Sequence, residues 1–314
     1  MPKIAYIEKK FKSDVIRLIK TCESICADFS RRGFELSLRQ LYYQLVKENV
    51  ISNDEKSYKH LGDIVSDARM AGIIDWNHIV DRTRNLRAAA AWDSASQAAN
   101  ACASQYRINR WQDQPIQVEC WVEKDALANV VMQACDPYSV PYFSCRGYCS
   151  QSEMWAAGMR ILRRAKSEKK NTLVLYLGDH DPSGIDMTRD VQDRLSLFTG
   201  AVRGEETEDG TPMRFIGSFY FQVRRIALSK QQIEKYDPPP NPAKVKDSRA
   251  KAYIDEHGEE SWELDALSPE MMVKLISDHI QSGIYQDAWD TAMEREKEEK
   301  NKLRDLAARM DEQE

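Results

Sequence analysis

The sequence predicts an α/β protein of two domains, a small helical N-terminal domain and a mainly parallel sheet with a helical C-terminus. Two observations carry the prediction. Three amphipathic helical segments come first, and from about residue 116 apolar strand-like segments alternate with helical ones, as in a parallel sheet flanked by helices. A length of 314 residues suits two domains. We place the boundaries at 1–85, 86–115 (a helical connector), 116–285 and 286–314 (a charged C-terminal helix).

The N-terminal segment predicts three helices followed by a hairpin. Apolar residues recur at helical spacing over residues 13–31, 38–49 and about 55–70. Ile73-Ile74 and His78-Ile79-Val80 then have the pattern of two short strands around a turn. Three helices and a small hairpin make a winged helix, a variant of the helix-turn-helix that binds DNA. Any other small helical domain would also fit this pattern.

The second half predicts the sheet. Strands are expected at residues 117–122, 142–145, 172–177 and, as one or two strands, 214–226. Helices are expected at residues 125–134, 151–166, 184–198 and 268–282, after an Ala-rich helical connector at 86–111. A stiff loop is expected at Pro238–Pro242. The dense alternating charge from Asp287 to Glu314 predicts a solvated helix.

Composition excludes several classes of protein. The chain carries 45 Lys and Arg against 50 Asp and Glu, so it is not a polycation. No apolar run approaches the roughly 20 residues that span a bilayer, and the N-terminus has no signal region. Seven cysteines, an odd number, favour a reducing compartment over a disulfide scaffold. We therefore expect a cytoplasmic protein.

Three carboxylates follow two predicted strands. Glu123 ends the strand that includes Val122, and Asp179 and Asp181 follow the buried strand that ends at Leu177. Sites in open α/β sheets form outside the carboxyl ends of strands, and residues two apart in an extended chain point the same way. Three hard oxygen donors in one crevice suit Mg²⁺, which can polarise a phosphodiester. Each carboxylate also has a local explanation, such as Asp181 capping a helix that begins at Pro182.

Helical periodicity separates two adjacent tyrosines. Tyr42 falls on the apolar stripe of the second predicted helix, and Tyr43 lies off it. The neighbours of Tyr43 one turn away are Arg39 and Lys47. A tyrosine between two cations on a polar face suits contact with a phosphate, and the cations would favour its phenolate. Tyr43 is therefore a candidate nucleophile, with Arg39 and Lys47 as phosphate or phenolate stabilisers, or else a surface tyrosine of a DNA-contacting helix.

A family resemblance rests on these motifs. Val122-Glu123-Lys124-Asp125-Ala126 and Asp179-His180-Asp181-Pro182-Ser183-Gly184 resemble the Glu and Asp-x-Asp motifs of a Toprim domain, a Rossmann-like fold. The version they resemble most is that of the topoisomerase VI A subunit and the related meiotic double-strand-break transesterase. Leu38-Arg39-Gln40-Leu41-Tyr42-Tyr43 matches the family's Arg-x-x-Tyr-Tyr, and Ser144-Cys145-Arg146-Gly147-Tyr148 stands where the family has a Gly-rich turn.

The resemblance implies a mechanism. It assigns Glu123, Asp179 and Asp181 to Mg²⁺ and makes Tyr43, on a winged-helix domain, the residue that attacks DNA and becomes linked to the 5′ end. It also implies a homodimer in which the tyrosine of one protomer works with the metal site of the other. The sequence has no GxxxxGK[ST] loop, so strand passage would need a separate ATPase subunit. Glu263 and Asp265 are unplaced, and we favour a surface strand over a second metal shell.

The leading expectation is therefore Mg²⁺-dependent cleavage of double-stranded DNA by a compact A-subunit-like protein. A Toprim-type nuclease that uses water is one alternative. A winged-helix DNA-binding module with a silent metal site is another. A phosphatase with Asp179 as nucleophile is disfavoured because it leaves Glu123 and Tyr43 unexplained. The expected DNA contacts, besides Arg39, are Lys47, Lys56, Lys59, His60, Arg69, Arg82 and Arg84 in the N-terminal half, and Lys124 and Arg146 at the crevice.

Overall fold

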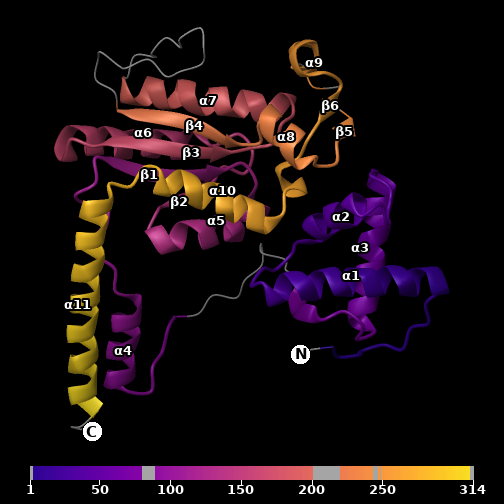
Figure 1. Ribbon diagram of the computed structural model, residues 1–314, viewed down its shortest axis with the longest axis horizontal. Helices are drawn as coiled ribbons and strands as arrows, with labels where there is room; N and C mark the ends of the chain where they lie inside the picture. The colour runs from indigo at the N-terminus through magenta and orange to yellow at the C-terminus, as the bar shows by residue number, and fades with distance from the viewer. Residues whose placement is uncertain (1–2, 80–88, 201–219, 243–246, 248, 312–314) are drawn as a thin grey trace.

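The computed structural model describes residues 3–79, 89–200, 220–242, 247 and 249–311. Figure 1 shows three N-terminal helices on one side, a sheet with helices on both faces, and a pair of helices that projects away from the sheet. We call residues 3–79 the N-terminal domain and the described part of 116–285 the sheet domain.

The N-terminal domain has the three predicted helices, α1 (Ser13–Arg31), α2 (Leu38–Lys47) and α3 (Glu55–Met70). Each buries one apolar face in a shared core, which explains why these segments are helical. Helix α2 begins at Ser37, whose side chain accepts from the Gln40 backbone N–H while the Gln40 side chain accepts from the Ser37 N–H. This cap fixes the first residue of α2, and therefore the positions of Arg39 and Tyr43 on the helix.

The predicted hairpin is wrong for its described part. Trp76–His78 forms a 3₁₀ turn, because the Asp75 side chain caps it by accepting from the Asn77 N–H at 2.9 Å. Ile74 is buried in the core instead of alternating along a strand. Only isolated bridges form nearby, Leu36 with Ile79 and Ala5 with Ala71. Val80 lies outside the described residues, so a winged helix stays a prediction.

The sheet domain is built on four parallel strands. They are β1 (Ile116–Val122), β2 (Tyr142–Ser144), β3 (Asn171–Leu177) and β4 (Phe221–Ala227). Their order is β2-β1-β3-β4 and every pairing is parallel, as the strand–helix alternation predicts. β1 and β3 are buried along almost their whole length, as expected for strands covered on both faces.

Helices cover both faces of the sheet (Figure 1). On one face lie α5 (Ala128–Cys135) and α10 (Pro269–Gln281), and on the other α6 (Gln151–Arg163) and α7 (Pro182–Thr199). Strand order then decides where a site can form. The chain leaves β1 for β2 on one side and leaves β3 for β4 on the other, so the carboxyl ends of β1 and β3 border a crevice at the topological switch point.

Short elements connect the longer strands and helices of the sheet domain. They are the turn at Asp125–Leu127, the turn at Asp136–Tyr138, the π-helical turn Arg164–Glu168, α8 (Lys230–Tyr236), α9 (Ala250–His257) and the 3₁₀ turn Leu264–Ala266. The proline-rich segment is not only a loop, because β5 (Asn241–Pro242) pairs antiparallel with β6 (Glu260–Ser261). This ribbon and the turn that follows it lie against α2 of the N-terminal domain.

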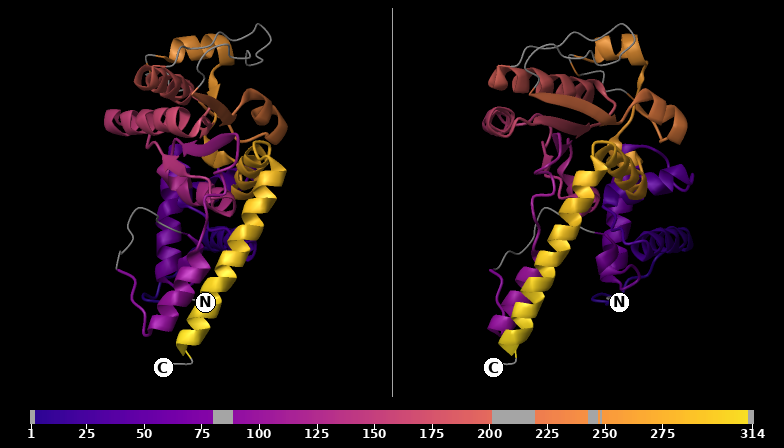
Figure 2. Two further views of the ribbon diagram at one scale, coloured as in Figure 1. Left: turned by 90° about the vertical axis from the view of Figure 1, so that its left-hand side faces the viewer. Right: turned by 60° about the vertical axis from the view of Figure 1, so that its left-hand side comes forward.

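Helices α4 (Ala95–Gln105) and α11 (Gln286–Asp311) lie side by side and project from the sheet domain (Figure 2). The connector helix is shorter than predicted within the described residues. Helix α11 is not solvated all round: Ala307 is buried, and the Glu296 carboxylate is bound by Arg110 through two hydrogen bonds of 2.8 and 2.6 Å. In the described part of the chain, no helix is long and apolar enough to cross a membrane.

Candidate functional site

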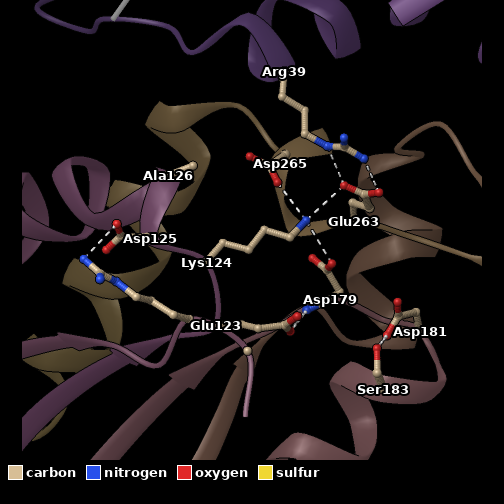
Figure 3. Close-up of a pocket in the computed structure, with 12 residues that line it drawn as sticks. Arg39, Glu123, Lys124, Asp125, Ala126, Asp179, Asp181, Ser183, Glu263 and Asp265 are labelled. Carbon is tan, nitrogen blue, oxygen red and sulfur yellow. Dashed lines mark hydrogen bonds and ion pairs between the residues drawn. The ribbon is translucent and has the colours of Figure 1, made fainter. Parts of the chain in front are cut away.

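Glu123, Asp179 and Asp181 line one cavity of about 490 Å³ at the crevice between β1 and β3 (Figure 3). They are 7%, 4% and 4% exposed. We call these three residues the acidic crevice. Glu123 follows β1, whereas Asp179 and Asp181 follow β3, so the parallel register brings them together. Arg39 enters the same cavity from the N-terminal domain.

Hydrogen bonds fix the three carboxylates. Glu123 Oε2 accepts from the Asp179 backbone N–H at 2.9 Å, and Asp179 Oδ1 accepts from the Leu264 N–H at 2.8 Å. Asp181 Oδ1 accepts from the Gly184 N–H at 2.7 Å and from the Ser183 hydroxyl at 2.8 Å. Asp181 is thus the N-cap of α7 as well as a wall of the cavity, so its local role and its place in the crevice coexist.

The loop that carries Asp179 and Asp181 is held from β4. The Arg225 guanidinium donates to the backbone carbonyls of Gly178, Asp179 and Gly184, at 2.9, 2.5 and 2.9 Å, and to the Thr188 hydroxyl at 2.6 Å. Gly184 is required here, because a Cβ at this position would overlap the Asp179 carbonyl oxygen. Arg225 and Gly184 together set the direction of the two aspartates.

Lys124 stands at the centre of the cavity (Figure 3). Its ammonium lies 2.9 Å from Asp179 Oδ2, 3.0 Å from Glu263 Oε2 and 2.8 Å from Asp265 Oδ2. The expectation that Glu263 and Asp265 lie on a surface strand is therefore wrong. Asp265 is fully buried, and both carboxylates turn inward because Lys124 and Arg39 attract them.

Like charges confined in the crevice perturb its titration. Burial, and next the charge of Asp179, raises the pKa of Glu123 to about 7. Burial also raises the pKa of Asp179 above its usual value, against the opposing charge of Lys124. Burial alone would lower the pKa of Lys124, but the charges of Asp265, Asp179 and Glu263 outweigh it and raise that pKa. The ammonium therefore stays charged and compensates part of the crevice's negative charge.

The donor chemistry of the crevice fits Mg²⁺. All three carboxylates of the acidic crevice offer hard oxygen, and Asp265 Oδ1 is a buried oxygen that accepts no hydrogen bond from the described residues. Within the described residues, no three His, Cys, Asp or Glu side chains are already grouped as a metal site. One reason that the carboxylates are not grouped is that the Lys124 ammonium binds an oxygen of Asp179. Ion binding would therefore require Lys124 to shift.

Tyr43 lies beside this network, but not as periodicity predicts. It is 1% exposed, and its hydroxyl accepts from Asn241 Nδ2 at 2.9 Å. Burial, and next the charge of Glu263, raises its pKa to about 12, so the expected preference for the phenolate is wrong for this state. Helical periodicity predicts that the face of α2 with Tyr43 is exposed to solvent. In the structure β5 packs against that face and covers it. Tyr42 is buried as predicted, with its hydroxyl 2.9 Å from Asn53 Oδ1.

The predicted DNA contacts fall into different settings. Lys47, Lys56 and Lys59 are exposed, and Lys59 pairs with Glu55. Arg146 is exposed at the rim of the cavity, 3.2 Å from Asp125 Oδ2. The expectation that Arg69 contacts DNA is not supported, because its guanidinium donates to the backbone carbonyls of Trp76 and Ile79. His60 is exposed on α3, and the predicted contacts Arg82 and Arg84 lie outside the described residues.

Sequence reasoning missed Arg225 and placed Glu263 and Asp265 wrongly. Each meets the crevice from a segment at least 40 residues away in the chain from its partner there. The acidic pair in Trp262-Glu263-Leu264-Asp265 was the sequence signal for two of them. Comparison with known proteins found no matching protein-family model and no matching curated protein.

Proposed function

We propose that this protein cleaves double-stranded DNA by Mg²⁺-dependent transesterification, with Tyr43 as the nucleophile. One observation carries the proposal: an unbroken series of contacts joins the tyrosine helix to the acidic crevice. Arg39 lies over the Tyr43 ring, with its guanidinium carbon 5.8 Å from the ring centroid, and it binds Glu263. Glu263 binds Lys124, which binds Asp179. Two cations and the three proposed oxygen ligands thus line one cavity, and the proposed nucleophile lies buried beside Arg39.

In the proposed step the Tyr43 oxygen forms a bond to phosphorus and the bond from phosphorus to the 3′ oxygen breaks. The tyrosine becomes esterified to the 5′ phosphate, the phenol proton leaves to a base, and the 3′ oxygen gains a proton. Arg39 and Lys124 bind the phosphate oxygens. Glu123, Asp179 and Asp181 would hold Mg²⁺, which would stabilise the charge that develops on the phosphate and the leaving oxygen.

One observation favours the hydrolytic alternative. Tyr43 is buried and hydrogen-bonded to Asn241, whereas the acidic crevice opens to the cavity. A nuclease that used water would need only the crevice, with Arg39 and Lys124 as phosphate ligands. The transesterase instead requires that the contact between β5 and α2 opens, so that Tyr43 can reach DNA.

Tyr43→Phe separates these functions, and Tyr42→Phe is its matched control because it removes a hydroxyl from the adjacent buried tyrosine. Supercoiled plasmid is incubated with each protein in Mg²⁺ or EDTA, stopped with detergent, and divided with and without protease. We expect protein-linked ends from the native chain and from Tyr42→Phe in Mg²⁺. We expect at least about a thousandfold loss in Tyr43→Phe, as for removal of a nucleophile. Free ends that persist in Tyr43→Phe would make the protein a nuclease.

A further inference from the structure

Two cations from different domains hold the same carboxylate at the edge of the cavity. Arg39 Nε donates to Glu263 Oε2 at 2.7 Å, and Arg39 Nη2 donates to Glu263 Oε1. Lys124 Nζ lies 3.0 Å from the same Oε2 atom. Figure 3 shows the three side chains converging, with Arg39 arriving from α2 and Lys124 from the end of β1.

This arrangement matches the way proteins bind a phosphodiester. An arginine fork binds two oxygens of a carboxylate or of a phosphate with the same geometry, and an ammonium adds a point charge. Each anion carries one negative charge and offers two acceptor oxygens. The carboxylate of Glu263 therefore occupies the position that a phosphodiester would take between Arg39 and Lys124.

The contact is also one that an external anion can replace. The Arg39 and Glu263 side chains are 39% and 16% exposed, and ion pairs that water reaches contribute little to stability. Lys124 would keep two carboxylate partners, Asp179 and Asp265, after Glu263 left. Arg39 also lies over the Tyr43 ring, 5.8 Å from its centroid, so a phosphate bound there would lie on the side of Arg39 that faces the cavity, near the proposed nucleophile.

We propose that Arg39 and Lys124 form a phosphodiester-binding subsite, which Glu263 fills in the DNA-free protein and leaves when DNA binds. The proposal rests on the proposed function only for the identity of the anion as DNA. Glu263 is then an internal competitor: it holds the subsite shut, keeps α2 against the crevice, and lowers the affinity for DNA until enough other contacts form.

Glu263→Gln tests this, because it keeps the size of the side chain and removes the competing charge. Binding is measured as fluorescence anisotropy of a labelled short duplex in EDTA at fixed salt, so that no cleavage occurs. We expect the Kd to fall at least about fivefold, a modest share of what a charge-assisted hydrogen bond contributes. The matched control is Glu260→Gln, which removes the same charge from an exposed residue of the same segment. It should change Kd less than about twofold.

A double variant shows whether the gain acts through the subsite. In the background Arg39→Gln, the added change Glu263→Gln should tighten binding much less, because only Lys124 is left to be released. A gain as large as in the native background would overturn the proposal, as would a Glu263→Gln protein that binds no more tightly than Glu260→Gln. Glu263→Asp is the second variant should Glu263→Gln not fold: it keeps the charge but shortens the reach to Arg39, and it should also tighten binding.

The outcome is independent of whether the protein cleaves DNA. If Glu263→Gln tightens binding and Tyr43 proves dispensable for cutting, the subsite stands and the transesterase does not. If Tyr43 forms protein-linked ends but Glu263→Gln leaves Kd unchanged, the transesterase stands and the exchange of anions does not.

Discussion

At the scale of single residues, Arg225 fixes the direction of Asp179 and Asp181 without lining the cavity itself. Arg225→Gln would leave up to three carbonyls without their donor, at a cost of about 1–3 kcal/mol for each one that stays buried. We expect the free energy of unfolding, measured in urea, to fall by about 2–4 kcal/mol, and the proposed DNA cleavage to be lost. The neighbouring Arg224→Gln is the control, since Arg224 is exposed and, among the described residues, its side chain donates to Gln222 Oε1 at 3.3 Å. Equal effects of the two changes would contradict this role.

The same scale shows what local sequence can and cannot indicate. The residues of the acidic crevice could be found because each follows a strongly apolar strand, and strand ends are a local signal. The burial of Tyr43 could not, because helical periodicity describes how α2 faces its own domain and says nothing about β5, about 200 residues later. Partner choice over such distances depends on tertiary packing, which also explains why Glu263 and Asp265 were misplaced.

At the scale of elements, a buried ion pair ties the projecting helix α11 to the segment that follows α4. The side chains of Arg110 and Glu296 are 7% and 3% exposed. Burial would raise the pKa of Glu296, but hydrogen bonds from Arg110 and Lys300 outweigh it and lower the pKa from 4.5 to about 2. A depressed carboxyl pKa contributes stability above the unfolded value of about 4.5, and this contribution disappears as pH falls towards about 2.

The free energy of unfolding of Glu296→Gln at pH 6 should therefore be about 3 kcal/mol lower than that of the native chain, which is the usual cost of removing one partner of a buried ion pair. Because the native carboxylate protonates in acid, the difference between the two proteins should shrink as pH falls from about 4.5 towards about 2. Urea unfolding at pH 6, 4 and 3 measures it. Glu298→Gln, on an exposed turn of the same helix, should match the native chain throughout. A difference that stays constant with pH would rule out the ion pair as its source.

The elements themselves were mostly predictable, for a physical reason. α1, α2, α3 and the strands β1 and β3 have strong periodicity or long apolar runs, and each buries that surface where expected. The prediction of a hairpin after α3 was wrong for its described part because two isoleucines followed by a short polar segment are compatible with a strand and with a capped 3₁₀ turn alike. The Asp75 side chain favours the turn by accepting from the Asn77 N–H.

At the scale of the whole molecule, polar contacts join the N-terminal domain to the sheet domain. Among the described residues they include Arg39 with Glu263, Tyr43 with Asn241, Asn53 with the Pro240 carbonyl, and Arg32 with Glu270, beside the buried Ala266. Polar interfaces between domains form and separate more readily than apolar ones. The N-terminal domain of a second copy can make the same contacts, because exchange of an identical domain creates no new surface.

Mixing two inactive proteins tests this exchange. Tyr43→Phe lacks the proposed nucleophile and Asp179→Asn lacks a proposed metal ligand, so each alone should fail to form protein-linked ends. In a dimer with exchanged domains, a mixed pair contains one site with both defects and one intact site. We therefore expect the mixture to regain protein-linked single-strand nicks, at up to about a quarter of the native rate, because half of the dimers are mixed and each has one intact site of two. A mixture as inactive as its parts would show that each chain completes its own site. The two results therefore distinguish a dimer that exchanges its N-terminal domains from protomers that each complete their own site.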